Sequence, residues 1–313
     1  MSIIIPCYNH AQFLPEAIDS ALAQTYPSIE VVVVNDGSPD NTTEVCRHYA
    51  GRILCVDQTN KGLAEARNAG IRAAHGEFIL PLDADDKLLP DSLARLVPVL
   101  QSSSEIGFVY GHRYLFSNDA DGNRIDPQDW RTRDWDSRIV DTYIRHSDGL
   151  LEFSAPDWNE EQMLIRNDVS CTILFRKSDW KLTGGYSTEF MRGLEDWDFY
   201  LGLVDLGRIG ACVHVPVFFY RMHQGDSMRT RMGGKYVNAS YHRLVKRHPH
   251  IFQRHAATLL DYWLNEYEKQ TAVAERYEKL YWNVRSGRLE RWGMPVPLAR
   301  LIRVMITALR RKK

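Results

Sequence analysis

Short apolar runs alternate with longer stretches in which apolar residues recur every three or four positions through the first third of the chain. The runs have the length of strands and the longer stretches have the length of helices. The predicted strands cover residues 3–6, 29–34, 53–56, 78–82 and 107–116. The predicted helices cover residues 11–24, 41–50, 63–74 and 91–100. This alternation is typical of parallel βαβ units, so the expected fold class is α/β with a doubly wound, mostly parallel sheet.

The regular pattern stops after residue 116 and returns only in part. Residues 117–165 are rich in Asp, Asn and Arg without clear periodicity, and a segment of this length is usually functional or mobile. The elements expected beyond it are a strand at 172–176, a helix at 196–206, short strands at 209–213 and 217–220, and helices from 234 onward with breaks at Pro249 and around 293–297. We therefore expect an α/β domain over residues 1–230 and a helical region over 231–313.

Residues 297–313 combine an apolar stripe with positive charge. The stripe repeats at helical spacing and consists of Leu298, Leu301, Ile302, Met305, Ile306 and Leu309. Around it, residues 285–313 hold nine basic residues against one acid. A helix of this kind suits the interface of an anionic membrane. The alternative is that the stripe packs on the protein's own helices or on a second copy in a homodimer, and the sequence leaves both open.

Composition narrows the class of protein. The 313 residues are 44% hydrophobic and 25% charged, which is typical of a globular chain with an apolar core. A net charge of −1 gives no reason to expect nucleic acid as a partner. The five cysteines match neither a disulfide framework nor a zinc motif, and neither a signal peptide nor a membrane-spanning stretch stands out. We therefore expect a cytoplasmic protein.

Three acids follow the predicted strand at 78–82. Asp83, Asp85 and Asp86 lie within four positions, and such crowding raises carboxyl pKa values unless a cation neutralises the charges. Carboxylate oxygens are ligands that a hard divalent ion such as Mg²⁺ prefers, together with oxygens of substrate phosphates. The alternative is a solvated acidic turn that begins the next helix. Because the strand before the cluster is apolar, we favour the metal site.

Asp36 holds the same place at the end of the strand at 29–34. Ligands of open parallel sheets bind beyond the carboxyl ends of the strands, where a carboxylate can accept hydrogen bonds from a base or a ribose. An Asp-Gly pair at a strand end is also ordinary turn chemistry. The residues alone leave both interpretations open.

Further charged residues lie where ligands are expected. Lys61 and Arg67 lie at the first turns of the helix at 63–74, which suits either diphosphate binding or an ordinary amphipathic helix. Glu195 and Asp196 begin a later helix, where acids complement the helix dipole but an aspartate can also act as a general base. His223 follows a predicted strand and is either a metal ligand or a surface residue.

Together these segments resemble one family. They are Ile3-Ile4-Ile5-Pro6-Cys7-Tyr8-Asn9, Asn35-Asp36-Gly37-Ser38, Asn60-Lys61-Gly62-Leu63, Leu82-Asp83-Ala84-Asp85-Asp86, Glu195-Asp196, and Tyr220-Arg221 followed by His223. Their order resembles that of the family 2 glycosyltransferases, over about residues 2–227. The resemblance implies the GT-A fold, a nucleotide-diphosphosugar donor, a Mn²⁺ or Mg²⁺ ion, and inversion at the anomeric carbon. The Gln-x-x-Arg-Trp segment of the family's processive synthases is missing, so we expect one sugar transferred per acceptor encounter.

The resemblance also implies residue roles on the donor side. Asp36 would bind the base, Arg67 would face the diphosphate, and Asp83 would contact the ribose side of the donor. Asp85 would bind the metal ion, joined by His223. The remaining residues expected to bind the donor are Pro6, Tyr8, Asn9 and Lys61.

On the acceptor side, Asp196 would be the catalytic base and Glu195 would hold the acceptor. The segment at 117–165 contains Trp130, Trp135 and Trp158. Because indole rings can cover the apolar faces of sugars, we expect these tryptophans to help bind a glycan acceptor. The alternative is that they pin a long loop to the core.

The expected activity is transfer of a sugar to an acceptor hydroxyl. UDP is the favoured donor nucleotide and dTDP the second, because Asp36 can accept a hydrogen bond from the N–H of uracil or thymine. A glycan or lipid-linked acceptor, in cell-surface polysaccharide or glycolipid assembly at the inner face of the membrane, fits the resemblance.

Two other classes compete with this activity. A sugar nucleotidyltransferase should carry a glycine-rich, basic loop where this chain has Pro6-Cys7-Tyr8-Asn9. A non-catalytic sugar-nucleotide-binding module should lack Asp85 or Asp196, and both are present.

Overall fold

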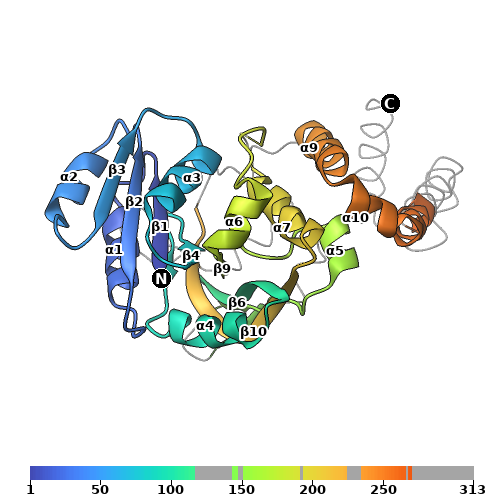
Figure 1. The fold of residues 1–313 in the computed structure, drawn as a ribbon, viewed down its shortest axis with the longest axis horizontal. Coiled ribbons are helices and arrows are strands. Elements are labelled where there is room, and N and C mark those ends of the chain that lie inside the picture. The colour runs from blue at the N-terminus through green and yellow to red at the C-terminus, as the bar shows by residue number, and fades with distance from the viewer. Residues whose placement is uncertain (117–142, 147–150, 191–192, 224–233, 266, 270–313) are drawn as a thin grey trace, which may run out of the picture. The chain divides into compact units, whose positions relative to one another are not determined.

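The structure, a computed structural model, describes residues 1–116, 143–146, 151–190, 193–223, 234–265 and 267–269. Contacts within the chain divide it into two units, Met1–Arg254 and His255–Lys313. The described part of the second unit is helical. The sheet and all predicted site residues belong to the first unit (Figure 1).

The first third of the chain alternates strand and helix as the sequence predicts. Its elements are β1 (Ser2–Cys7), α1 (Leu14–Leu22), β2 (Glu30–Asp36), α2 (Thr42–His48), β3 (Leu54–Gln58), α3 (Leu63–Ala73) and β4 (Phe78–Pro81). The four strands are parallel in the order β3-β2-β1-β4. Their carboxyl ends therefore lie along one edge of the sheet, where ligands of such sheets bind.

Alternate side chains of the two central strands pack against opposite helix layers. Ile3 and Val31 belong to the core that α1 covers. Ile4 and Val34 face α3, where a Cβ on Gly70 would lie 2.4 Å from Ile4 Cγ2. Only a glycine allows the helix this close to the sheet, so the apolar strands predicted from the sequence are covered on both faces.

The later elements of the sheet run in mixed directions. They are β5 (Lys87–Leu88), α4 (Ser92–Ser102), β6 (Ile106–Phe116), β7 (Tyr143–Arg145), β8 (Leu151–Phe153), α5 (Glu160–Ile165), β9 (Leu174–Arg176), α6 (Lys177–Thr183), α7 (Glu195–Asp205) and β10 (Ile209–Arg221). Strand β9 lies between β4 and β6 and is antiparallel to both, whereas β10 is parallel to β6. The α/β class expected from the sequence is thus confirmed.

Two details differ from the sequence prediction. The short strands expected at 209–213 and 217–220 are one strand, β10, whose register against β6 shifts between Val213 and Pro216. Pro216 has no N–H to donate to the neighbouring strand, so the pairing becomes irregular where the sequence suggested a break. The aperiodic segment also contains β7, β8 and α5, which are too short for a periodicity to appear.

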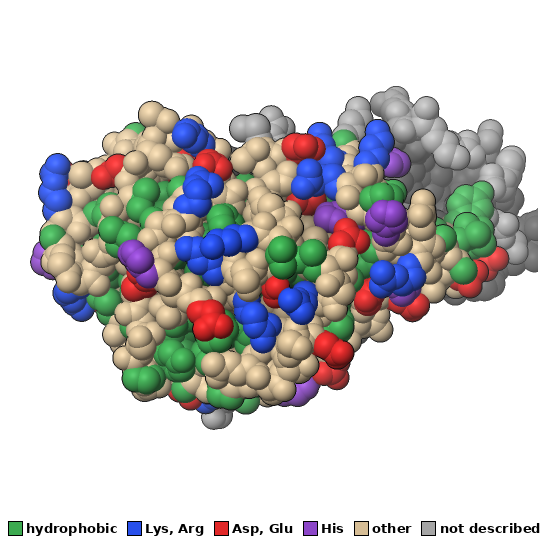
Figure 2. Space-filling view, viewed as in Figure 1, with side chains coloured by type: hydrophobic (Ala, Val, Ile, Leu, Met, Phe, Trp, Pro, Cys, Tyr) green, Lys and Arg blue, Asp and Glu red, His purple; other side chains and the backbone are tan. Residues whose placement is uncertain are grey.

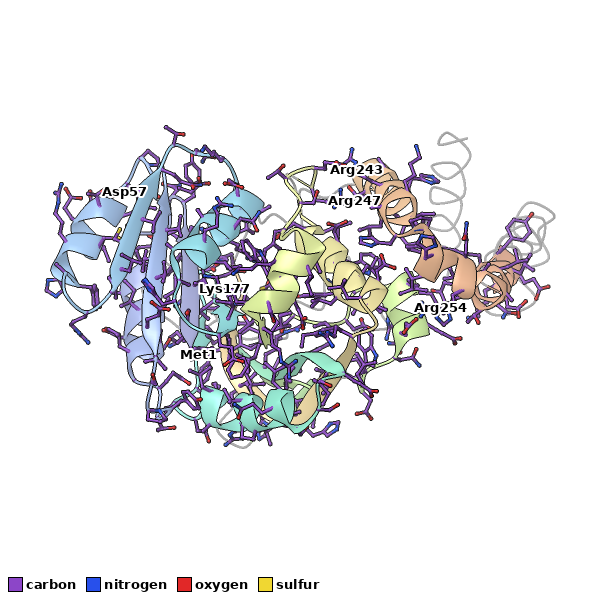
Figure 3. All side chains as sticks on the ribbon, in the orientation of Figure 1. Met1, Asp57, Lys177, Arg243, Arg247 and Arg254 are labelled. Atoms are coloured by element: carbon purple, nitrogen blue, oxygen red, sulfur yellow. The ribbon has the colours of Figure 1, made fainter. Side chains whose placement is uncertain are left out.

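Helices α9 (Gly234–Arg247) and α10 (Pro249–Arg254) complete the first unit, with the break at Pro249 that the sequence predicts. Arg243 and Arg247 project from the same side of α9 (Figure 3). Arg243 Nη1 donates to the carbonyl oxygen of Glu189 at 2.8 Å, and Arg247 Nε donates to Asp198 Oδ1 at 2.7 Å. These contacts join α9 to the rest of the first unit, at Glu189 and at Asp198 of α7.

Several predictions fall on other residues. The boundary proposed between residues 230 and 231, the tryptophans at 130 and 135, and the apolar stripe at 297–313 lie outside the described residues. No helix in the described part of the chain is long and apolar enough to cross a membrane. On the face shown in Figure 2, basic and acidic side chains of the described residues are interspersed and do not form a large patch of a single charge.

Candidate active site

The end of β1 and the loop after it form one wall of the candidate site. Pro6 is buried in the strand, whereas Tyr8 and Asn9 are exposed just beyond it. Asn9 adopts a left-handed conformation with φ of 58°, which asparagine tolerates better than most residues. Its N–H donates to Ser38 Oγ at 3.2 Å. The loop after β1 is thereby joined to the loop after β2, and Tyr8 remains free to contact a ligand.

Asp36, at the end of β2, organises the loop that leads into α3. Its Oδ1 accepts hydrogen bonds from Gln58 Nε2 at 2.7 Å and from the backbone N–H of Lys61 at 2.8 Å. Its Oδ2 accepts from the N–H of Gly62 at 2.9 Å, and the side chain is only 2% exposed. The Lys61 side chain is exposed. Gln58, which the sequence did not single out, fixes the carboxylate that is expected to bind the base.

Asp85 and His223, the two predicted metal ligands, lie together although 138 residues separate them. Asp85 Oδ2 is 2.6 Å from His223 Nε2 and 3.9 Å from His10 Nδ1. Burial opposes ionisation of Asp85, but the hydrogen bond to His223 and the charges of His10 and His223 outweigh it, so its pKa lies below the ordinary value. Both side chains keep a solvent-exposed part, 17% for Asp85 and 31% for His223. His10 was missed from the sequence because no spacing connects it to the acids.

Asp86 differs from its two acidic neighbours. It is buried, and its Oδ1 accepts the N–H of Arg221 at 2.9 Å. Burial, then the charges of Asp85 and Asp83, raise the pKa of Asp86 well above its ordinary value. Burial, together with the crowding expected from the sequence, therefore favours the neutral form of this one acid of the three. Arg221 Nε also donates to the carbonyl oxygen of Asp85 at 2.8 Å, and this pairing brings His223 to Asp85.

Arg67 joins the two sides of the site. The side chain is fully buried, and it donates from Nη2 to Asp83 Oδ1 at 2.8 Å and from Nη1 to Glu195 Oε1 at 2.6 Å. Its guanidinium also lies 5.4 Å from the centre of the Tyr186 ring. The predicted contact between Arg67 and a diphosphate stays a prediction, because the structure places both Nη atoms on protein carboxylates. Asp83 accepts in addition from Cys171 Sγ at 3.2 Å, a contact that no sequence pattern suggested.

Asp196 lies at the start of α7, after an unusual turn. Gly193 and Leu194 have φ of 105° and 73°, and such backbone at a non-glycine residue often marks a functional site. Asp196 Oδ2 accepts from Asn167 Nδ2 at 3.2 Å, and Oδ1 accepts from the N–H of Trp197 at 2.7 Å. Burial, then the charge of Glu195, raise the pKa of Asp196 to about 7. A carboxyl group with this pKa can accept a proton near neutral pH.

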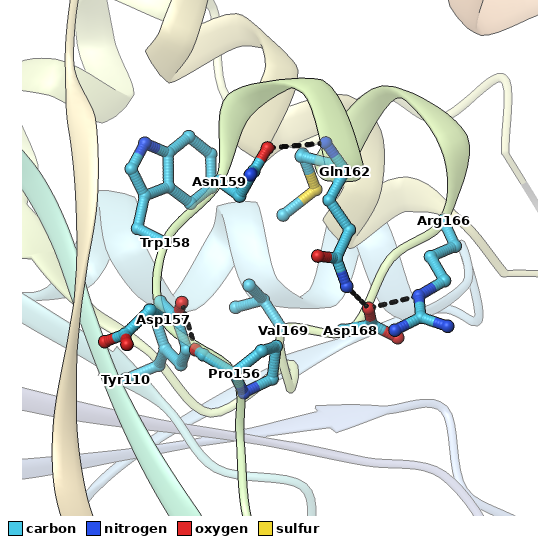
Figure 4. Close-up of a pocket in the computed structure, with 10 residues that line it drawn as sticks. Tyr110, Pro156, Asp157, Trp158, Asn159, Gln162, Arg166, Asp168 and Val169 are labelled. Atoms are coloured by element: carbon cyan, nitrogen blue, oxygen red, sulfur yellow. Dashed lines mark hydrogen bonds and ion pairs between the residues drawn. The ribbon is translucent and has the colours of Figure 1, made fainter. Parts of the chain in front are cut away.

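A small open pocket lies beside the segment that holds Asn167 (Figure 4). Trp158, Tyr110 and Asp168 are among the residues that line it. The Trp158 ring packs edge-to-face on Phe108 of β6 at 5.1 Å between centres. This contact fits the alternative in which the indole pins the loop to the core, while the pocket keeps an acceptor contact open.

Comparison with known proteins adds a family match. The family model described as "Glycosyl transferase family 2" matches residues 2–178. Four curated relatives, all uncharacterized glycosyltransferases, are 42% to 46% identical over 99 to 123 residues. This chain spans only 29% to 38% of their length. The chondroitin synthase of Pasteurella multocida (strain Pm70) is 29% identical over 211 residues, which are 66% of this chain and 19% of that enzyme.

Solved structures share the fold. S. aureus TarS 1–349 in complex with UDP-GlcNAc has a TM-score of 0.56 and 17% identity, covering 82% of this chain and 72% of the other. The mannosyltransferase PcManGT from Pyrobaculum calidifontis, in complex with GDP-Man and Mn²⁺, has a TM-score of 0.53 and 20% identity, covering 82% and 74%.

Proposed function

The chain belongs to glycosyl transferase family 2, and on this premise we propose that it transfers a sugar, with inversion, from a nucleotide diphosphosugar to an acceptor hydroxyl. The observation that carries the proposal is the convergence of acids from the strand ends of the parallel half of the sheet and from the start of α7. Arg67 holds Asp83, beside the Asp85–His223 pair, and Glu195, beside Asp196. This bridge supports assigning the donor-side acids and the candidate base to one site.

The donor nucleotide that we favour is UDP. The Asp36 carboxylate at the end of β2 would accept the N–H of a uracil ring. Tyr8 and Asn9 are exposed beside it, and the ribose side of the donor would lie toward Asp83. The complexes of TarS with UDP-GlcNAc and of PcManGT with GDP-Man show that this fold accommodates either nucleotide, so the preference rests on Asp36.

Asp85 and His223 would hold a divalent metal ion. One carboxylate and one imidazole lie 2.6 Å apart, both partly exposed, with His10 close by. A nitrogen ligand favours Mn²⁺ over Mg²⁺, which prefers oxygens. An ion in this place supplies positive charge that stabilises the departing diphosphate. PcManGT, with Mn²⁺ in its complex, is a relative in fold with such an ion.

The transfer itself is a direct displacement. Asp196 accepts the proton of the acceptor hydroxyl while that oxygen attacks the anomeric carbon from the face opposite the nucleotide. The bond from the anomeric carbon to the diphosphate oxygen breaks, and its electron pair leaves with the nucleoside diphosphate. Asn167 holds one oxygen of Asp196, and Glu195, fixed by Arg67, would position the acceptor.

The acceptor that we propose is a glycan or a lipid-linked sugar in surface polysaccharide or glycolipid assembly. Its support is the similarity to a chondroitin synthase over 66% of this chain. An enzyme of this kind would act at the inner face of the membrane. The basic, apolar segment 297–313 would then either contact the membrane or form the interface of a homodimer. Co-sedimentation with anionic and neutral vesicles, compared with a chain that ends near residue 293, separates these two cases.

A donor screen tests the proposed activity. Nucleoside diphosphate release is measured for UDP-, dTDP- and GDP-sugars, with Mn²⁺, with Mg²⁺ and with chelator. We expect release from a UDP-sugar that requires the metal ion. Turnover of GDP-sugars alone would overturn the assignment of Asp36, and full turnover in chelator would overturn the metal assignment.

A further inference from the structure

A group of side chains that could hold a metal ion lies on the strands β6 and β10, apart from the residues of the proposed active site. His112 of β6 and Cys212 and His214 of β10 each offer one ligand atom, and these atoms lie within 4.8 Å of one another. The strands are paired in parallel, with Cys212 opposite Tyr110 and the register shift of β10 just after Val213. Because residues two apart on a strand share a face, His112 and Cys212 point to the same side of the sheet as Tyr110. The irregularity after Val213 occurs at His214, whose ring centre lies 5.9 Å from that of His112.

Each of the two imidazoles is held by a carboxylate on one nitrogen. His112 Nδ1 lies 2.7 Å from Glu152 Oε1 of β8, and His214 Nε2 lies 3.1 Å from Asp157 Oδ1. The nitrogens left to bind a cation are therefore Nε2 of His112 and Nδ1 of His214. A carboxylate on the far nitrogen fixes the tautomer and orientation of a metal-binding histidine and raises its basicity. Two such pairs lie around one cysteine, with one ligand atom of each residue within 4.8 Å of the others.

The third ligand, Cys212, has only weak partners of its own. Its Sγ lies 3.7 Å from the carbonyl oxygen of Ala155 and 3.6 Å from that of Val213, which are long contacts for a thiol. His112 is buried, Cys212 is partly buried and His214 is exposed. The cluster is therefore closed on the side of the sheet and open to solvent at His214, so that an ion can enter.

The ligand set identifies the class of cation. Two imidazole nitrogens and one sulfur suit zinc and similar borderline-soft ions, and they do not suit Mg²⁺, which prefers oxygen. Zinc–ligand bonds of about 2.0–2.3 Å place the ligand atoms of a tetrahedral site roughly 3.5 Å apart. Ligand atoms within 4.8 Å need only small side-chain movements to reach this spacing. A water molecule can take the fourth position.

We propose that His112, Cys212 and His214 bind a zinc-type divalent cation at a site separate from the Asp85–His223 pair. The ion joins the irregular middle of β10 to β6, where the register shift interrupts the ladder. Glu152, which also contacts His146 Nε2 at 2.7 Å, orients His112 for this purpose. The site thus stabilises the strand that ends at Arg221, next to the proposed active site.

Cobalt binding to the metal-free full-length chain tests the proposal. Co²⁺ occupies zinc sites, and a thiolate ligand produces a sulfur-to-cobalt charge-transfer band in the near ultraviolet. We expect one equivalent of Co²⁺ to give this band and one equivalent of Zn²⁺ to remove it. Absence of the band at saturating Co²⁺ would overturn the proposal.

Variants separate this site from others in the chain. Cys212→Ser should lose the charge-transfer band, and His214→Ala, at an exposed position that folding tolerates, should weaken Zn²⁺ binding at least about tenfold. Glu152→Gln should weaken it roughly 10- to 100-fold. The matched control, Cys55→Ser, removes a partly buried cysteine of β3 and should keep the band. A band that survives in Cys212→Ser, or that disappears in Asp85→Ala, would place the ion elsewhere and overturn the assignment.

Discussion

Asp85 and Asp196 are both assigned to the proposed active site, but their surroundings shift their pKa values in opposite directions. Asp85 follows the parallel half of the sheet and has two histidines beside it, at 2.6 Å and 3.9 Å, which help to lower its pKa. Asp196 begins α7 beside Glu195, where burial and a like charge raise its pKa to about 7. Two residues of one type therefore differ in protonation near neutral pH because of what surrounds them.

The difference matches the two roles that we propose. A metal ligand must be an anion over the working pH range, so it profits from neighbouring cations. A general base must accept a proton from a weakly acidic hydroxyl, so a pKa near the working pH suits it. Arg67 lies between the two environments and contacts an acid on each side. The predictions below alter one environment at a time.

The largest effect is expected for Asp85→Ala. Loss of this carboxylate should abolish transfer, because a bound metal ion typically contributes several kcal/mol of charge stabilisation. Calorimetry should show that Mn²⁺-dependent UDP binding is strongly weakened while the protein stays folded. The matched control is Asp91→Ala, which removes an acid paired with Arg95 on α4 and should leave both properties unchanged. Unchanged Mn²⁺-dependent UDP affinity in Asp85→Ala would rule out the metal assignment.

The next effect concerns the base. Asp196→Asn should lower turnover by roughly 10²–10⁴-fold, the usual range for loss of a general base, with donor affinity nearly intact. Steady-state kinetics with a fixed donor measures the first, and calorimetry measures the second. Glu195→Gln is the comparison. If it is inactive while Asp196→Asn keeps near-normal turnover, the base is Glu195 and the contrast between the two aspartates has no catalytic meaning.

Arg67→Met removes the cation between the two sides and keeps most of the side-chain volume. Leaving Asp83 and Glu195 without their buried partner should lower the free energy of unfolding by about 3–5 kcal/mol, measured by urea denaturation. Because Arg67 lowers the pKa of Asp196, the folded fraction should also show its activity shifted to higher pH. A variant that is merely less stable, with an unshifted pH profile, would show that Arg67 has no influence on the base.

The smallest effect is the pH dependence of the unmodified protein. Turnover under saturating substrates should rise about tenfold per pH unit below the pKa of Asp196, near 7, and level off above it. Folding raises the pKa of Asp196 from 3.8 to about 7. Between pH 3.8 and about 7 the folded state therefore binds more protons than the unfolded state, so the free energy of unfolding falls as pH rises. The contribution of Asp196 to stability is present below pH 3.8 and is lost as pH rises through about 7. Comparison with Asp196→Asn isolates both trends. A turnover profile that is flat from pH 5 to 8, roughly the span over which such a group titrates, would contradict the assignment.

Local patterns predicted the parallel half of the sheet well. Apolar runs of strand length became β1 and β2, and Asp36 and Asp85 stand at strand ends, as the sequence indicated. The later half was less predictable, since β7, β8 and α5 are shorter than the window in which a period can be recognised. The antiparallel insertion of β9 between β4 and β6 had no counterpart in any local pattern.

The sequence by itself determined the strand–helix alternation, the family, and which residues carry acids at strand and helix ends, because these follow from short-range periodicity and from motifs of neighbouring residues. Only the tertiary structure decided how those acids are charged. The partners that set their environments, such as His10 for Asp85 and Asn167 for Asp196, come from distant parts of the chain. Burial and charge act through space, so a pKa that depends on them cannot be read from the order of residues.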